Sequence, residues 1–74
     1  MNKAVEKRIG KSIRAIRESK GMTQDQLAAK LQLRGCDITR SAVAKIEVGQ
    51  RHLYIDEAIL IKEIFNVTFE ELVK

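Results

Sequence analysis

Residues 23–51, TQDQLAAKLQLRGCDITRSAVAKIEVGQR, contain two short helical patterns separated by a glycine-containing turn. Thr23 and Gln26 are three residues apart. This spacing predicts a capping box, in which each side chain accepts a hydrogen bond from the other residue's backbone N–H. Thr39 is a suitable N-cap for the second pattern. The stretch therefore predicts two helices, over about 23–33 and about 40–47.

The second of these helices has few apolar residues. Val43 and Ile46, three positions apart, are its only large apolar side chains and mark a single buried edge. Its other positions are small or basic, except for one acid, Glu47. A helix of about two turns does not persist without tertiary packing. We therefore expect this edge to anchor the helix while its other faces stay open.

Three more helical patterns flank this stretch. Apolar residues three or four apart predict amphipathic helices over about 4–19 and about 55–65. Thr68 and Glu71 repeat the capping-box spacing and start a last short helix that ends at Leu72-Val73. Suitable stops for the first three helices are the glycines Gly21, Gly35 and Gly49.

Composition agrees with a helical protein. The 74 residues include no proline, few aromatic residues and many good helix formers. The apolar share of 45% and charged share of 32% suit a globular chain rather than a disordered one. We predict an all-α fold, a compact bundle of five short helices, as a single domain over 1–74 with its core at about 5–73.

Charge is distributed unevenly along the chain. Residues 1–51 carry 12 Lys/Arg and 5 Asp/Glu, a balance of +7, whereas residues 52–74 carry 2 and 5, a balance of −3. A basic front and an acidic back suggest a polyanionic partner that approaches from one side. A charged, solvated surface without such a partner is the alternative.

Several classes of protein are disfavoured. The N-terminus lacks the apolar run of a signal peptide, and no stretch is apolar enough to span a membrane, so we expect a cytoplasmic protein. We find no catalytic or metal-ligand pattern and expect no enzyme, cofactor, metal or small-molecule ligand. Cys36 is the only cysteine. It serves either as a small, semi-apolar packing residue, which is the simpler interpretation, or as a redox sensor.

Two motifs resemble those of a known family. They are Thr23-Gln24-x-x-Leu27-Ala28 and Thr39-Arg40-Ser41-x-Val43-x-Lys45-Ile46-Glu47-x-Gly49-x-Arg51. In this order and spacing they resemble the Cro/phage-repressor (XRE-type) helix-turn-helix family, over about residues 9–72. The resemblance implies that the helix over 40–47 is a recognition helix. Such a helix enters the major groove of double-stranded DNA, while the helix before it crosses the backbone.

The connection at 32–37 departs from the family pattern. The family links its second and third helices by a turn of about four residues, and the turn here is longer. Extra loop residues cost little free energy. The sequence therefore leaves open the angle at which the recognition helix is held.

The resemblance also suggests residues that contact DNA. Four residues occupy positions where the family contacts DNA bases: Arg40, Ser41, Ala44 and Lys45. Arginine can bond guanine O6 and N7 bidentately, and an alanine can pack against a thymine methyl group. Four more residues are candidates for contacts with the DNA backbone: Gln24, Thr39, Gln50 and Arg51. The alternative for each basic residue is a solvated surface position.

Glu47 is unexpected beside DNA because its carboxylate would repel phosphates. The resemblance implies that it pairs with Arg17 on the first helix, as a structural ion pair. Segment 55–65 has more apolar residues than one core face needs, and Leu60 and Ile64 are candidates for a homodimer interface. The alternative is that the last helix and the N-terminal residues cover them. Operators of such proteins are often palindromic because the protein is two-fold.

The predicted function is a sequence-specific DNA-binding transcriptional regulator, most simply a repressor. One alternative is an antitoxin or restriction-controller regulator with the same DNA-binding face. Another is a helical protein–protein interaction module that has lost DNA binding. The exposed basic positions Arg40 and Lys45, together with Ser41, argue against the last.

Overall fold

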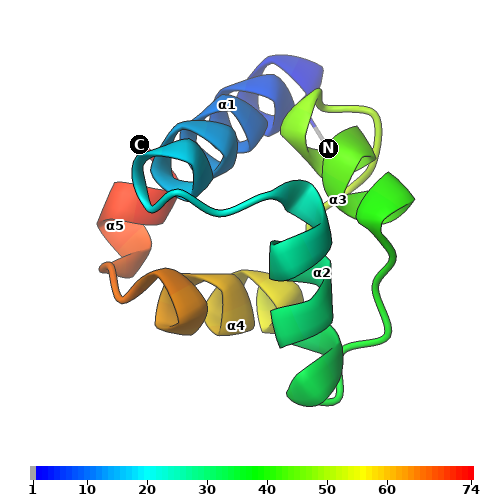
Figure 1. Ribbon diagram of the computed structural model, residues 1–74. Coiled ribbons are helices and arrows are strands. Elements are labelled where there is room, and N and C mark those ends of the chain that lie inside the picture. The colour runs from blue at the N-terminus through cyan, green and yellow to red at the C-terminus, as the bar shows by residue number, and fades with distance from the viewer. Residues whose placement is uncertain (1) are drawn as a thin grey trace.

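Five helices make up the computed structural model, which describes residues 2–74 (Figure 1). They are α1 (Lys3–Ser19), α2 (Gln24–Leu33), α3 (Arg40–Glu47), α4 (Ile55–Phe65) and α5 (Phe69–Leu72). The all-α prediction is confirmed, and the predicted helix ranges differ from the observed ones by about one residue. Of the helices in this part of the chain, none has the length and apolar content needed to cross a bilayer.

The helices start where the sequence provides caps. The Thr23 hydroxyl accepts a hydrogen bond from the Gln26 N–H at 3.0 Å, and the Gln26 side chain accepts one from the Thr23 N–H at 2.8 Å. The Thr39 hydroxyl accepts from the Ala42 N–H at 3.1 Å. α1 begins one residue earlier than predicted, because the Asn2 side chain caps it.

The core lies between α1, α2 and α4, with α3 and α5 closing its ends. Figure 1 shows α5 at one end of the bundle, where it contacts both α1 and α4. α3 packs against α1 and α2. The buried apolar side chains come from every helix and from the α2–α3 turn: Ile13, Leu27, Ala28, Leu31, Ile38, Val43, Ile46, Ala58, Ile61, Phe65 and Leu72. Residues of α3 are thus part of one continuous core.

The turn between α2 and α3 is anchored to the core. Ile38 is only 1% exposed, and its carbonyl accepts a hydrogen bond from the Gln32 side chain at 2.8 Å. The Cys36 N–H donates to the Leu31 carbonyl at 3.0 Å, which closes the end of α2 around Gly35, at φ +84°. The extended turn is therefore an ordered connection, and the buried Ile38 positions the start of α3.

Gly10 marks the closest approach of α1 to α3. A Cβ atom at this position would lie 2.6 Å from the carbonyl oxygen of Glu47, and it would also overlap the carbonyl oxygen of Ile46. Both atoms belong to the backbone at the end of α3, which has no side-chain freedom to move aside. This role of Gly10 was not predicted, since a glycine inside a helical pattern does not reveal what packs against it.

Candidate nucleic-acid interface

α3 presents two chemically different faces. Val43, Ile46 and Glu47 are buried against the domain. The predicted base-contacting residues lie on the other side: Arg40, Ser41 and Lys45 are exposed, and Ala44 is half-buried. Since Ser41 and Lys45 are one turn apart, they lie on the same face of the helix. The structure thus brings the basic and hydroxyl groups together on the exposed side of α3.

A buried ion pair fastens the end of α3 to α1. Arg17 Nε donates to one carboxylate oxygen of Glu47 at 2.7 Å, and Nη2 donates to the other at 3.1 Å. Arg17 is 7% exposed and Glu47 is 3% exposed. The hydrogen bond from the guanidinium to Glu47 raises the pKa of Arg17 further above its ordinary value. The structure therefore places Glu47 away from the exposed face and satisfies its charge internally.

Gln24 extends this pair to the start of α2. Its side-chain amide donates to a carboxylate oxygen of Glu47 at 2.9 Å. Arg17 Nη1 also donates to the carbonyl of Met22, just before α2, at 2.7 Å. Glu47 therefore joins α1, α2 and α3 at one point. Gln24 was assigned a backbone contact with DNA, and the structure shows that its amide also braces α3.

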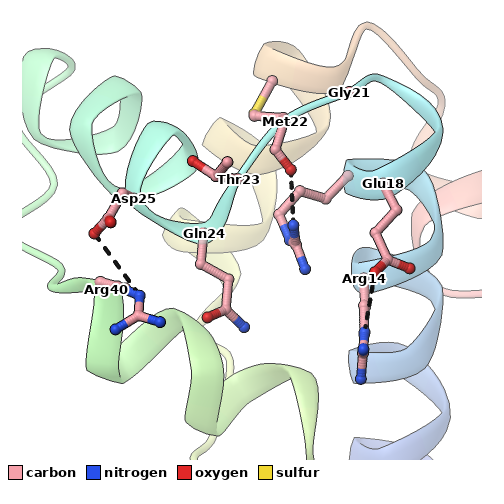
Figure 2. A pocket seen from close by; sticks show the side chains of 9 residues that line it. Arg14, Glu18, Gly21, Met22, Thr23, Gln24, Asp25 and Arg40 are labelled. Carbon is pink, nitrogen blue, oxygen red and sulfur yellow. Dashed lines mark hydrogen bonds and ion pairs between the residues drawn. The ribbon is translucent and has the colours of Figure 1, made fainter.

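A hollow of about 690 Å³ lies between the C-terminal end of α1 and the N-terminal ends of α2 and α3. Figure 2 shows the side chains that line it. Two cations at its edge each face an acid: Arg14 Nε lies 3.5 Å from Glu18, and Arg40 Nε lies 3.8 Å from Asp25. The hollow therefore carries both signs of charge, with each of these two exposed arginines facing a carboxylate.

Arg51 makes contacts within the protein. Its two terminal nitrogens donate to the two carboxylate oxygens of Glu57, each at 2.9 Å, and one also donates to the His52 carbonyl. Its guanidinium lies over the Tyr54 ring, 5.7 Å from the centroid. Burial raises the pKa of Glu57, but the hydrogen bonds from Arg51 and from the Tyr54 N–H outweigh it, so the pKa is lowered overall. This pair was not predicted from the sequence, because Arg51 lies in the loop before α4 and no helical spacing relates it to Glu57.

The other predicted DNA backbone residues lie near α3. Thr39 is exposed, but its hydroxyl serves as the N-cap of α3. Gln50 is exposed just after the helix, and its N–H donates to the Lys45 carbonyl at 2.8 Å. Contact of these residues with DNA stays a prediction.

The predicted dimer residues are partly covered. Leu60 and Ile64 are half-buried and pack against the core. Other apolar side chains are more exposed: Ile55 is 66% exposed, Ile59 is 42% exposed and Phe69, on α5, is 39% exposed. The exposed apolar surface of α4 is therefore centred on Ile55 and Ile59.

Cys36 is also half-buried against the core, in the α2–α3 turn. Burial raises the pKa of its thiol. Since the thiolate is the reactive form, this environment disfavours redox chemistry and suits a small packing residue.

The family is established by sequence. A helix-turn-helix family model matches residues 13–72, so the chain belongs to the helix-turn-helix family, of the XRE type. Proteins of this class are DNA-binding transcriptional regulators, and so is this chain. Among proteins with curated functions, none matches the sequence.

Two solved structures are similar over almost the whole chain. The restriction-modification controller protein C.AhdI from Aeromonas hydrophila is 26% identical, with a TM-score of 0.83 over 95% of this chain and 94% of that chain. The DNA-binding domain of BldD is 24% identical, with a TM-score of 0.84 over the full length of both chains. The second likeness shows the fold alone.

Proposed function

We propose that the protein is a sequence-specific repressor that inserts α3 into the major groove of double-stranded DNA. The observation that carries this proposal is the division of α3 into a buried edge and an exposed face. The buried edge, with Val43 and Ile46, holds the helix, and the exposed face carries Arg40, Ser41 and Lys45. Because small residues, Ala42 and Ala44, separate these groups, the backbone can approach the bases closely.

Base recognition would rest on the exposed face. Arg40 is the first residue of α3, which is the end of a recognition helix that meets the base edges. Its guanidinium would bond guanine bidentately. Ser41 and Lys45 would contact neighbouring bases or phosphates, and Ala44 would allow contact with a thymine methyl group.

Phosphate contacts would orient the helix without specifying sequence. Gln24 is at the start of α2, which packs against α3, and Thr39 and Gln50 lie just before and just after α3. Arg51 can join them with the nitrogen edge that Glu57 does not occupy. A repressor would then occlude its promoter, and DNA binding would place the protein on the nucleoid.

Selection of bound sequences from a random DNA pool, at two salt concentrations, tests this proposal. We expect a defined motif and a steep loss of affinity with salt, since each neutralised phosphate contributes a slope of about −0.9. Arg40→Ala should relax one base pair of the motif by about 1–3 kcal/mol. Absence of any enriched sequence over competitor DNA would sink the proposal and favour a protein–protein module.

We further propose that the protein binds a palindromic operator as a homodimer through α4. The exposed side chains Ile55 and Ile59 support this face, as does Phe69 on the neighbouring α5. Ile55 and Phe69 line an apolar groove of about 340 Å³ whose walls also include Leu53, Ala58 and Val73. Leu60 and Ile64 would flank the interface. Burying this surface is favourable in proportion to the apolar area removed from water.

Ile59→Lys should abolish the dimer, because it places a charge in the centre of an apolar contact. Sedimentation equilibrium at protein concentrations on the order of tens of micromolar would then show a monomer with unchanged helix content. Leu33→Lys is the matched control, since Leu33 is 87% exposed on α2, outside this face. A wild-type protein that is monomeric under the same conditions would refute the proposed interface.

The similarity to the controller protein C.AhdI supports a second candidate function, control of a restriction-modification gene pair. Both functions use the same DNA-binding face. They differ in which gene is regulated, and therefore in where the operator lies. Mapping the selected motif onto the genome separates them. A motif upstream of a restriction gene would support the controller function, and a motif elsewhere would support a general repressor.

A further inference from the structure

We propose that Asp25 is a specificity-determining residue, which acts by orienting Arg40 toward the base edges. This inference rests on the proposed role of Arg40. Asp25 lies in the first turn of α2 and Arg40 is the first residue of α3. Asp25 Oδ1 lies 3.8 Å from Arg40 Nε, and within residues 2–74 this is the only ion pair that either side chain makes.

The geometry leaves the useful edge of Arg40 free. Its Nε edge faces Asp25, while in Figure 2 the two terminal nitrogens lie on the side of the guanidinium away from Asp25. Bidentate bonding to guanine needs two N–H groups of one guanidinium, held in a fixed orientation. Asp25 therefore restricts the rotation of Arg40 without occupying its terminal nitrogens.

Asp25 is itself held in place relative to α3. The preceding residue, Gln24, donates to Glu47 at the far end of α3, at 2.9 Å. Glu47 is in turn fixed by Arg17. These contacts tie the start of α2 to α3, so the fold sets the position of the Asp25 backbone relative to Arg40.

The pair has little role in folding. The two side chains are 65% (Arg40) and 76% (Asp25) exposed, and exposed ion pairs contribute little to stability. A carboxylate at a surface that meets phosphates also lowers affinity for every DNA sequence. An acid at this position thus weakens binding to DNA of any sequence. By orienting Arg40, it also favours binding to sites that carry the base pair that Arg40 reads.

Glu18 provides a matched control. It lines the same hollow, its side chain is 56% exposed, and it pairs with Arg14 rather than with Arg40. Glu18→Gln and Asp25→Asn each remove one negative charge from this surface. A purely electrostatic role of Asp25 predicts the same result for both variants, whereas a positioning role predicts different results.

The experiment measures the dissociation constants of wild type, Asp25→Asn, Glu18→Gln, Arg40→Ala and the Asp25→Asn/Arg40→Ala double variant. Each protein is titrated with the selected operator, with operators changed at single base pairs, and with random duplex. Thermal unfolding verifies that each variant is folded.

We expect Asp25→Asn to reduce discrimination at the Arg40 base pair by about fivefold or more and to strengthen binding to random duplex. Glu18→Gln should strengthen binding to all duplexes alike and leave discrimination unchanged. In the Arg40→Ala background, Asp25→Asn should have no further effect on discrimination, because Asp25 acts through Arg40.

Two results would overturn the inference, and they are distinguishable. If Arg40→Ala relaxes one base pair but Asp25→Asn shifts all duplexes alike, Asp25 only repels phosphates and the role of Arg40 stands. If Arg40→Ala leaves discrimination unchanged at every position, the proposed base contact of Arg40 fails and the role of Asp25 fails with it.

Discussion

Replacing Glu47 with alanine is expected to lower the free energy of unfolding by about 3–5 kcal/mol. The substitution removes the acceptor of two hydrogen bonds from Arg17 and one from Gln24. It leaves the guanidinium of Arg17, a residue 7% exposed, without its counter-ion. The free energy of unfolding of a domain of this length is only about 4–11 kcal/mol. The variant should therefore retain little stability, and a substantial fraction of it should be unfolded at growth temperature.

Thermal unfolding followed by circular dichroism measures the effect. A loss of this size should lower the Tm by about 15 °C or more in a domain of this size. Glu18→Ala serves as the control, because it removes a carboxylate from an exposed pair and should cost about 0.5 kcal/mol or less. A Glu47→Ala variant that melts within a degree or two of wild type would show that the buried pair does not stabilise the fold.

Gly10→Ala should also destabilise the domain, although helix propensity alone predicts the opposite. Alanine inside a helix is favoured over glycine by about 0.5–1 kcal/mol. At this position the added methyl group would overlap the carbonyl oxygens of Ile46 and Glu47. Overpacking against atoms that cannot rotate away costs about 1–3 kcal/mol or more, so we expect a net loss and a displacement of α3 from α1.

The control for Gly10→Ala is Lys11→Ala, at the exposed neighbouring position of the same helix. Lys11→Ala should leave the Tm nearly unchanged, whereas Gly10→Ala should lower it by about 5–15 °C. Operator binding should weaken at temperatures where the variant is still folded, because α3 no longer sits in place. A raised Tm for Gly10→Ala would contradict this prediction, because it would mean that α1 and α3 can move apart to admit the methyl group without loss of stability.

Local signals in the sequence predicted most of the helix boundaries. Thr23, Thr39 and Thr68 start helices because a hydroxyl three residues before a free N–H is a short-range relation. Glycines end helices for a similarly local reason, as Gly35 does at φ +84°. The start of α1 at Asn2 was missed, although the asparagine was a visible candidate for an N-cap.

Relations between distant residues were accessible only through the family resemblance or not at all. The resemblance named Arg17 as the partner of Glu47, 30 positions apart. It gave no indication of the contact at Gly10, because that contact depends on how α1 and α3 pack. The Arg51–Glu57 pair was missed for another reason, since it depends on the conformation of the loop that precedes α4. The identity of the exposed apolar residues on α4 likewise depended on which sides of that helix α2 and α5 cover.

The interleaving of buried and exposed positions along α3 has a consequence for changing the DNA target of this protein. The side chains that would select bases, at 40, 41 and 45, can be exchanged without altering the packed positions 43, 46 and 47. Libraries randomised at the first set should therefore yield folded proteins with new operator preferences. Changes at the second set should produce unfolded chains, so the two kinds of selection experiment can be run independently.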